Sequence, residues 1–353
     1  MTLKKTKIFF YADIEDRKYE GRSQTSLEIK RFLEKNGFEF VDHPSKADLI
    51  QIHSSGIANS FQAARWKEKY KVPVVYSLYS LSKTEPWNHF RNHFAQRYYL
   101  RPRKTSFLLS YSAVLPLRWR TFPLKKIDLV ITPSYSVQKR LFNNSKVIRI
   151  GINTKKFLPL NLPRDADQVR EGYLKVGYFG HPSAYKGLLD FVRASRILSS
   201  EGYECSAYLS DTTPKMINNL QKINPLLKIY GYTSDLTKAY NQMDIIILPY
   251  RSHLAGVANP LVLLEAMACG KAIITTNFSY LQEIVKDSAL IIKPYSPKEI
   301  IKAVNKLKQN ELRETLGKKA REIIEVEFNQ ERMFEEYLQI YKELLTNTDQ
   351  KKT

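Results

Sequence analysis

The sequence predicts an α/β protein with two doubly wound domains. Short apolar segments rich in β-branched residues alternate along the chain with longer amphipathic segments. The apolar segments are continuous, a pattern typical of parallel strands covered by helices on both faces. The alternation stops once, at 158–173, where two prolines and a polar run indicate a linker. The length of 353 residues agrees with two domains of about 150 residues each.

The first half is expected to contain five strands and two helices. Residues 7–12 form a continuous apolar run, which predicts a buried strand. Residues 25–35 have helical periodicity, and Asn36 and Gly37 end that helix. The other expected elements are strands at 47–53, 72–78, 127–132 and 146–150 and a helix at 61–70.

The second half repeats this alternation. Strands are expected at 174–180, 205–209, 228–230, 244–249, 271–275 and 289–292. Helices are expected at 187–199, 214–223, 236–241, 260–268 and 296–308. A last, strongly periodic helix at 329–345 has Phe334, Leu338, Tyr341 and Leu345 on one face.

These elements divide the chain into a first domain at 1–157, the linker at 158–173, a second domain at 174–327 and a terminal helix at 328–346. Ligands of doubly wound domains bind outside the carboxyl ends of the parallel strands. We expect the two domains to face each other across a ligand cleft formed by these two edges.

The composition narrows the partners and the compartment. Lysine and arginine number 56 against 35 acidic residues, a net charge of +21 that predicts an anionic partner. Two cysteines argue against a disulfide framework or a zinc site. No apolar run reaches the length of a membrane-spanning helix. The apolar stretch 8–11 is too short for a secretory leader, so we expect a reducing, cytoplasmic compartment.

The segment 256–270 contains an acidic residue that its own helix does not explain. Asn259 is expected to cap a helix whose first residue is Pro260, and free N–H groups at such a start favour an anion. Glu265 lies further along, with apolar neighbours at i±3 and i±4 and no basic partner. A buried carboxylate needs hydrogen-bond donors from elsewhere. A ribose diol would supply two; the alternative is a structural bond to a nearby backbone amide.

A lysine lies in a matching place of the same domain. The segment 177–187, GYFGHPSAYKG, joins an expected strand to an expected helix, and Lys186 comes just before that helix. The helix dipole disfavours a cation there, whereas a bound phosphate would reverse that penalty. An ordinary surface lysine is the alternative. Together with Glu265, Lys186 predicts a clamp for a nucleotide diphosphate.

These segments, together with 231–235, 239–249 and 275–285, resemble family 4 glycosyltransferases of the GT-B fold. The first half agrees at 127–134 and 150–153, followed by Phe157. The resemblance covers nearly the whole chain, most strongly 127–285. It implies two facing Rossmann-like domains with an interdomain cleft. The first would lie on the acceptor side, the second would bind the nucleotide sugar, and the terminal helix would cross back to the first.

In this family a sugar passes from a nucleotide diphosphate sugar with retention of configuration, usually without a metal or other cofactor. By resemblance, Lys186 would hold the diphosphate and Glu265 the ribose. Backbone amides around Gly256 would face the donor sugar, and Tyr232 would lie near the base. The full expected donor set is Gly180, His181, Lys186, Tyr232, Gly256, Val257, Ala258 and Glu265.

The chain departs from the family pattern at several positions. Val257 stands where the first glutamate of an E-x7-E motif is expected, and Tyr79 stands where a histidine often follows the fourth strand. Serine and tyrosine at 279–280 replace paired glycines. His181 occupies the place of an arginine, and it either replaces that arginine in part or packs in its loop. The nucleotide-binding frame is therefore better matched than the catalytic groups.

No nucleophile or Ser/His/Asp arrangement is visible, so catalysis is expected to rely on positioning and on Lys186 stabilising the leaving diphosphate. His53 ends an expected strand at the cleft, and we predict that it is a catalytic residue, with Lys186, and contacts the acceptor. A satisfied histidine at a strand end is the alternative. Gly21, in an expected loop, and Tyr79 complete the acceptor side.

Residues 83–126 contain ten basic residues and one acidic residue, which is +9 of the net charge. Aromatic residues recur there at helical spacing, a pattern typical of a helix lying in an anionic membrane interface. The alternatives are that the rings pack in the first domain's core or stack on nucleic-acid bases. The residues concerned are Trp87, Phe90, Phe94 and Tyr98, with Arg91 and Arg97 alongside.

The expected function is transfer of a hexose to a lipid-linked or glycan acceptor by a protein peripheral on the inner face of the cell membrane. The first alternative is a non-catalytic nucleotide-sugar binder, which the departures at Val257 and Tyr79 favour. The second alternative is a nucleic-acid-binding protein on the same fold.

Overall fold

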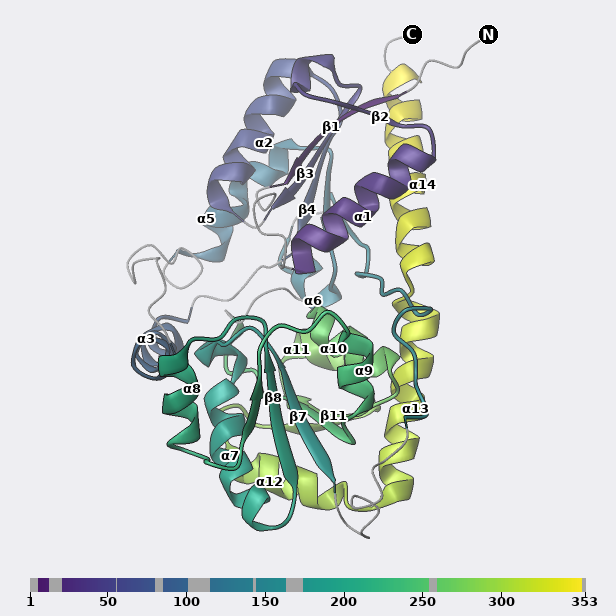
Figure 1. Cartoon of the computed structure of the whole chain (residues 1–353). Coiled ribbons are helices and arrows are strands. Elements are labelled where there is room, and N and C mark those ends of the chain that lie inside the picture. Colours follow the sequence, from purple (N-terminus) through teal and green to yellow (C-terminus); the bar gives the residue numbers. More distant parts are fainter. Residues whose placement is uncertain are drawn as a thin grey trace.

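The chain forms two six-stranded, all-parallel sheets, one in each half (Figure 1). The α/β class and the two-sheet arrangement predicted from the alternation are confirmed. The structure, a computed structural model, describes residues 6–12, 21–54, 56–79, 85–100, 115–141, 144–162, 174–253 and 259–350.

The first sheet has the order β2-β1-β3-β4-β5-β6. The expected strand at 7–12 agrees with β1, whereas the short edge strand β2 was not predicted because three residues carry no readable pattern. The strands are β1 (Lys7–Ala12), β2 (Glu39–Val41), β3 (Leu49–Ser54), β4 (Val74–Leu78), β5 (Leu129–Thr132) and β6 (Ser145–Val147).

The second sheet has the order β12-β11-β10-β7-β8-β9. Numbered from its own first strand, this is the 3-2-1-4-5-6 order of dinucleotide-binding domains, and its switch point lies between β7 and β10. The strands are β7 (Lys175–Gly180), β8 (Glu204–Leu209), β9 (Lys228–Tyr230), β10 (Ile245–Leu248), β11 (Ala272–Thr276) and β12 (Ala289–Ile292).

Helices cover both faces of the second sheet, which is why its strands read as continuous apolar runs. In β10, Ile245 and Ile247 pack with one set of helices, whereas Ile246 and Leu248 pack with the other. The first set is α7 (Leu188–Ser200), α8 (Pro214–Gln221) and α12 (Pro297–Lys306). The second set is α9 (Leu236–Asn241), α10 (Leu261–Ala268), α11 (Ser279–Val285) and α13 (Asn310–Glu327). Neither α11 nor α13 was predicted.

The first sheet is covered by helices from both ends of the chain. Helix α14 (Gln330–Gln350) packs on the same face as α1 (Gly21–Lys35), and both bury side chains against Ile8 of β1. Helix α2 (Ile57–Tyr70) packs on the opposite face. Tyr337 and Tyr341 of α14 are fully enclosed there, so the first domain is completed by the last described helix.

The carboxyl edges of the two sheets face each other. The carboxylate of Glu283, on α11, accepts hydrogen bonds from Ser134 Oγ at 2.9 Å and from the backbone N–H groups of Tyr135 and Ser136. These three residues follow β5 and begin the short helix α6 (Tyr135–Gln138). The two segments of the chain that connect the domains also pair with each other, because Ile152 forms a parallel bridge with Asn329.

One segment of the expected first domain packs on the second domain. Helix α3 (Pro86–Ala95) continues into η2 (Gln96–Leu100), a turn of π-helix, and Leu100 is buried in the core of the second sheet. The assignment of all residues from 1 to 157 to one domain therefore needs correction at 85–100. The reason is that His89, Asn92 and Gln96 form a polar face that bonds to the second domain.

Candidate functional site

The connections that follow β7 and β10 leave the second sheet at its switch point, where ligands of such folds bind. The first connection leads through the 3-10 turn η6 (Ala184–Lys186) into α7. The second leads through residues 249–253 toward α10, which carries Glu265. Lys186 and Glu265 thus belong to neighbouring connections at one sheet edge.

The turn that carries Lys186 is held against the connection after β10. Gly187 has φ +79°, and a Cβ there would lie 1.8 Å from the carbonyl oxygen of Pro249, so only glycine fits. The N–H of Arg251 donates to the carbonyl of Tyr185 at 2.9 Å. Lys186 itself is half-buried. A Cβ at Gly180, where φ is +141°, would lie 4.0 Å from the Cδ of Lys186, so Gly180 borders the lysine side chain.

A buried ion pair locks the same two connections together. The guanidinium of Arg251 donates to both carboxylate oxygens of Asp190, at 2.6 and 2.5 Å. Both side chains are almost completely buried, and Asp190 lies in the first turn of α7, where a negative charge is favourable. The start of α7 is therefore fixed relative to the loop after β10.

Glu265 is buried on α10, as the sequence suggested, and its donor is Tyr240 of α9. The Tyr240 hydroxyl donates to Glu265 Oε2 at 2.7 Å. Burial raises the pKa of Glu265, while this hydrogen bond and the charge of Lys156 oppose the rise. A carboxylate accepts about four hydrogen bonds, and in the described part of the chain Tyr240 is the donor bonded to this one. Further hydroxyl donors can therefore be accepted.

The start of α10 differs by one residue from the expectation. Pro260 is the N-cap, with ψ 120°, and Leu261 is the first helical residue. Asn259 therefore precedes the cap rather than forming it, because the extended backbone continues through the proline. Gly256, Val257 and Ala258, expected to face the donor sugar, lie outside the described residues.

The remaining expected donor residues lie around the same edge. His181 follows β7, and its Nδ1 is 3.1 Å from the hydroxyl of Ser210, which follows β8. This contact agrees with the alternative in which His181 packs in its loop. Tyr232 follows β9 and is 64% exposed. Their roles toward a nucleotide stay predictions.

His53 ends β3 and is completely buried, so in this structure an acceptor cannot contact it. Its Nδ1 lies 2.5 Å from the hydroxyl of Tyr79, and its ring stacks on Phe10 at 4.7 Å. Burial lowers the pKa of His53 to about 3, so the ring is neutral at physiological pH. The structural alternative describes its surroundings better than contact with an acceptor does. Gly21 begins α1 instead of lying in a loop.

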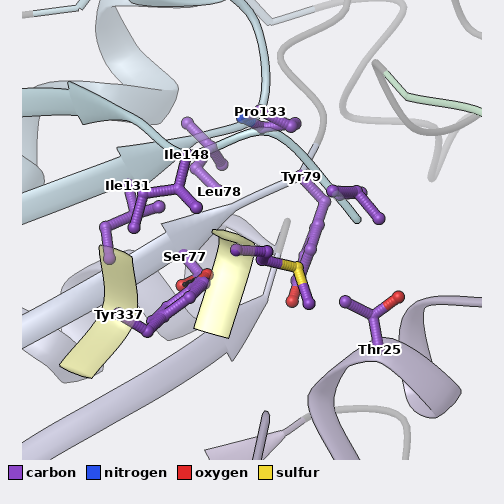
Figure 2. Close-up of a pocket in the computed structure, with 10 residues that line it drawn as sticks. Thr25, Ser77, Leu78, Tyr79, Ile131, Pro133, Ile148 and Tyr337 are labelled. Atoms are coloured by element: carbon purple, nitrogen blue, oxygen red, sulfur yellow. Dashed lines mark hydrogen bonds between the residues drawn. The ribbon is translucent and has the colours of Figure 1, made fainter. Parts of the chain in front are cut away.

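A cavity of about 10 Å³ lies at the carboxyl edge of the first sheet, between β4, β5, α1 and α14 (Figure 2). Thr25, Ser77, Tyr79 and Tyr337 line it, and the hydroxyls of Ser77 and Tyr337 are 2.9 Å apart. Such a volume holds no more than one water molecule. The cavity is therefore no sugar-binding site as it stands.

Several contributors to the site were not predicted. Tyr240 lies in a motif that carried the family resemblance without a role of its own, and Arg251 and Asp190 are 61 residues apart. The signal available in the sequence was a polar side chain among apolar neighbours of a helix, as with Asp190 of α7. Among the described residues, no cluster of three or more His, Cys, Asp or Glu side chains is arranged to hold a metal ion.

Comparison with known proteins agrees with this geometry. Residues 164–323 match the family described as "Glycosyl transferases group 1". The chain is 27% identical over 217 residues to the capsular polysaccharide biosynthesis glycosyltransferase CapM of Staphylococcus aureus, covering 57% of this chain and 55% of that protein. It is 24% identical over 208 residues to the N,N'-diacetylbacillosaminyl-diphospho-undecaprenol alpha-1,3-N-acetylgalactosaminyltransferase of Campylobacter jejuni, covering 56% of this chain and 54% of that one. The matches thus span about half the length of these curated relatives.

The fold is shared over almost the whole chain with the Anabaena protein Alr3699/HepE, solved in complex with UDP. The TM-score is 0.69 at 16% identity, covering 96% of this chain and 100% of that one. Two facing parallel sheets of this kind are the GT-B fold. The region that matches the glycosyl transferases group 1 family, residues 164–323, contains the whole second sheet, from Lys175 to Ile292.

Proposed function

We propose that the protein transfers a hexose, with retention of configuration, from a nucleotide diphosphate sugar to a lipid-linked or glycan acceptor. The observation that carries this proposal is that Lys186 and Glu265 lie on neighbouring connections at the switch point of the second sheet. A diphosphate and a ribose are separated along one nucleotide, and these two side chains offer a cation and a hydrogen-bond acceptor for them.

In the proposed reaction, the bond between the anomeric carbon and the diphosphate oxygen breaks, and the acceptor oxygen bonds to that carbon on the same face. The acceptor proton passes to the departing diphosphate. The Lys186 ammonium stabilises the charge that develops on this leaving group. Glu265 accepts hydrogen bonds from the ribose, and Tyr240 holds the carboxylate in place. No metal is required by this scheme, and nucleotide diphosphates bind through backbone N–H groups and the lysine.

Two observations support the kinds of donor and acceptor. The Anabaena protein of the same fold was solved with UDP, and the acceptor named for the Campylobacter relative is a diphospho-undecaprenol. A lipid-linked acceptor implies work at a membrane surface, and we propose the inner face of the cell membrane. Among the described residues, no helix is both long and apolar enough to cross a bilayer.

The test begins with a thermal-shift panel of nucleoside diphosphates and their sugars, because selective binding raises the melting temperature. Glu265→Ala should weaken nucleotide binding by about 1.5–3 kcal/mol, the range for hydrogen bonds to a charged group. Glu322→Ala, an exposed position on α13, is the matched control. A folded Glu265→Ala variant with unchanged nucleotide affinity would contradict the ribose assignment.

Catalysis is tested separately, by incubating the protein with the donor that binds and following slow donor hydrolysis and transfer to lipid-linked acceptors. Binding without any turnover would identify a non-catalytic nucleotide-sugar binder. Salt-dependent oligonucleotide binding that nucleoside diphosphates leave unchanged would favour a nucleic-acid-binding protein.

A further inference from the structure

Helix α3 and the adjoining η2 present a row of exposed aromatic rings, which we call the aromatic stripe: Trp87, Phe90, Phe94 and Tyr98. These residues are 75%, 48%, 66% and 71% exposed. Successive rings touch along the helix, with centroids 6.1 Å apart for Trp87 and Phe90 and 5.9 Å apart for Phe90 and Phe94. The stripe is therefore not part of the first domain's core.

The opposite face of the same helix is buried against the donor half. The backbone N–H of Ala184 donates to Gln96 Oε1 at 2.8 Å, and Gln96 Nε2 donates to the carbonyl of Pro182 at 3.2 Å. His89 Nδ1 lies 2.8 Å from the hydroxyl of Tyr185. These contacts are to the turn that ends at Lys186. The helix that carries the aromatic stripe therefore packs directly against the candidate diphosphate site.

Cations flank the stripe, and a second aromatic group has the same character. Arg91 and Arg97 are exposed on α3 and η2, and the Arg91 guanidinium lies 4.2 Å from the centre of the Tyr295 ring. The second group lies on α5 (Leu117–Thr121) and η4 (Phe122–Lys126), on the same side of the molecule as α3 (Figure 1). It consists of Trp119 and Phe122, 64% and 60% exposed, with exposed Arg118, Lys125 and Lys126.

These observations favour one occupant. Rings beside cations match a lipid interface, where the rings enter the acyl boundary and the cations meet anionic headgroups. Glu85 is the one acidic residue within 85–100, and 115–126 has none. Two copies of this surface would therefore repel each other, whereas an anionic bilayer complements it.

We propose that the aromatic stripe, on a helix packed against the second domain, docks the protein on an anionic phospholipid membrane together with the second aromatic group on α5 and η4. The inference rests on the proposed function for the identity of the acceptor. Docking itself needs neither sugar nor nucleotide. It places the lipid surface beside the turn that carries Lys186, where a lipid-linked acceptor is required.

The first test is flotation with vesicles of phosphatidylcholine alone or mixed with phosphatidylglycerol. The wild-type protein should float with the mixed vesicles and remain behind with the neutral ones. The double variant W87S/F94S should bind the mixed vesicles at least about tenfold more weakly than the wild type, because two interfacial rings are lost. Val326→Ser, an exposed apolar position on α13 far from the stripe, is the matched control and should bind normally. Equal flotation of the double variant and wild type would overturn the proposal.

The second test needs a single substitution, in case the double variant fails to fold. The chain has three tryptophans, and Trp66 packs edge-on against Phe9 with ring centroids 5.3 Å apart. In Trp119→Phe, mixed vesicles should shift the emission of Trp87 to shorter wavelength, and brominated lipid should quench it. No shift and no quenching would contradict docking through α3.

Other occupants give different results. A dimer that dissociates in W87S/F94S, seen by sedimentation without vesicles, would replace the lipid by a second copy. Displacement of the protein from vesicles by short RNA at constant salt would replace it by nucleic acid. Vesicle binding without any glycosyl transfer would contradict the proposed function and leave the docking surface standing. Transfer to a soluble acceptor without vesicle binding would support glycosyl transfer and contradict the docking surface.

Discussion

The carboxyl edges of the two sheets are built in opposite ways. At the first edge, side chains near the ends of β3 and β4 bond to neighbouring tyrosines, His53 to Tyr79 and Ser77 to Tyr337 of α14. At the second edge, β7 ends in glycine, and a second glycine lets the Lys186 turn approach the loop after β10. The first edge is filled by its own aromatic and polar groups, whereas the second edge carries Lys186 and Glu265 on neighbouring connections. The difference teaches that backbone contacts hold the connections of the second edge in place, whereas side chains close the first edge in this structure.

The largest effect is expected from breaking the ion pair that holds the second edge together. Arg251→Met leaves the Asp190 carboxylate buried without its partner, which costs about 3–5 kcal/mol of unfolding free energy. Urea denaturation measures this loss. The exposed pair of Lys46 and Asp42 is the control, and Lys46→Met should lower the unfolding free energy far less because solvent screens this pair. Equal losses in the two variants would show that the buried pair does not organise this edge.

The next largest effect concerns activity. Lys186→Ala should lower kcat/KM by about 100- to 1,000-fold, the range for removal of one group that stabilises developing charge. Nucleoside diphosphate affinity should fall much more than nucleoside affinity, which calorimetry distinguishes. The control is Lys222→Ala, an exposed lysine that follows α8. If both ligands weaken equally, Lys186 does not act on the diphosphate.

A smaller effect sharpens the contrast at the first edge. Folding holds His53 neutral down to about pH 3, whereas the unfolded chain takes up a proton near pH 6.5. Unfolding therefore gains a proton between these values, so stability falls as the pH falls through this range. Between pH 7 and pH 5 the burial of neutral His53 lowers the free energy of unfolding by about 2 kcal/mol. His53→Gln should remove that part of the pH dependence in urea denaturation, and an unchanged slope would mean that His53 is protonated in the folded protein.

The regular elements of the second domain were largely predictable from sequence. The bounds of α9, β9 and β12 agree with the expectation, because each apolar run there is bounded by polar or turn residues. Helix α13 was missed although Leu316, Ala320 and Ile324 recur at helical spacing, because most of its other residues are polar. The edge strand β2 was missed because it has three residues.

The candidate site was predictable only in part. Glu265 stood out because no residue of its own helix could pair with it, and the structure supplies Tyr240 from α9. Such partners come from other elements, and no spacing within one segment identifies them. The same reason explains the docking of α3 on the second domain, since Gln96 and Ala184 are 88 residues apart in the chain. Local periodicity predicted the helix and its aromatic face but not the surface that its other face meets.

The position of α14 has a consequence for biosynthesis. Its residues leave the ribosome after all the other described elements, yet Tyr337, Ile340 and Tyr341 pack against Ile8 near the start of the chain. Until α14 is made, α1 covers only part of this face of the first sheet, and the apolar side chains that α14 buries stay exposed. The domain that is translated first is therefore finished late, and nascent chains carry a surface that chaperones can bind until α14 has been made.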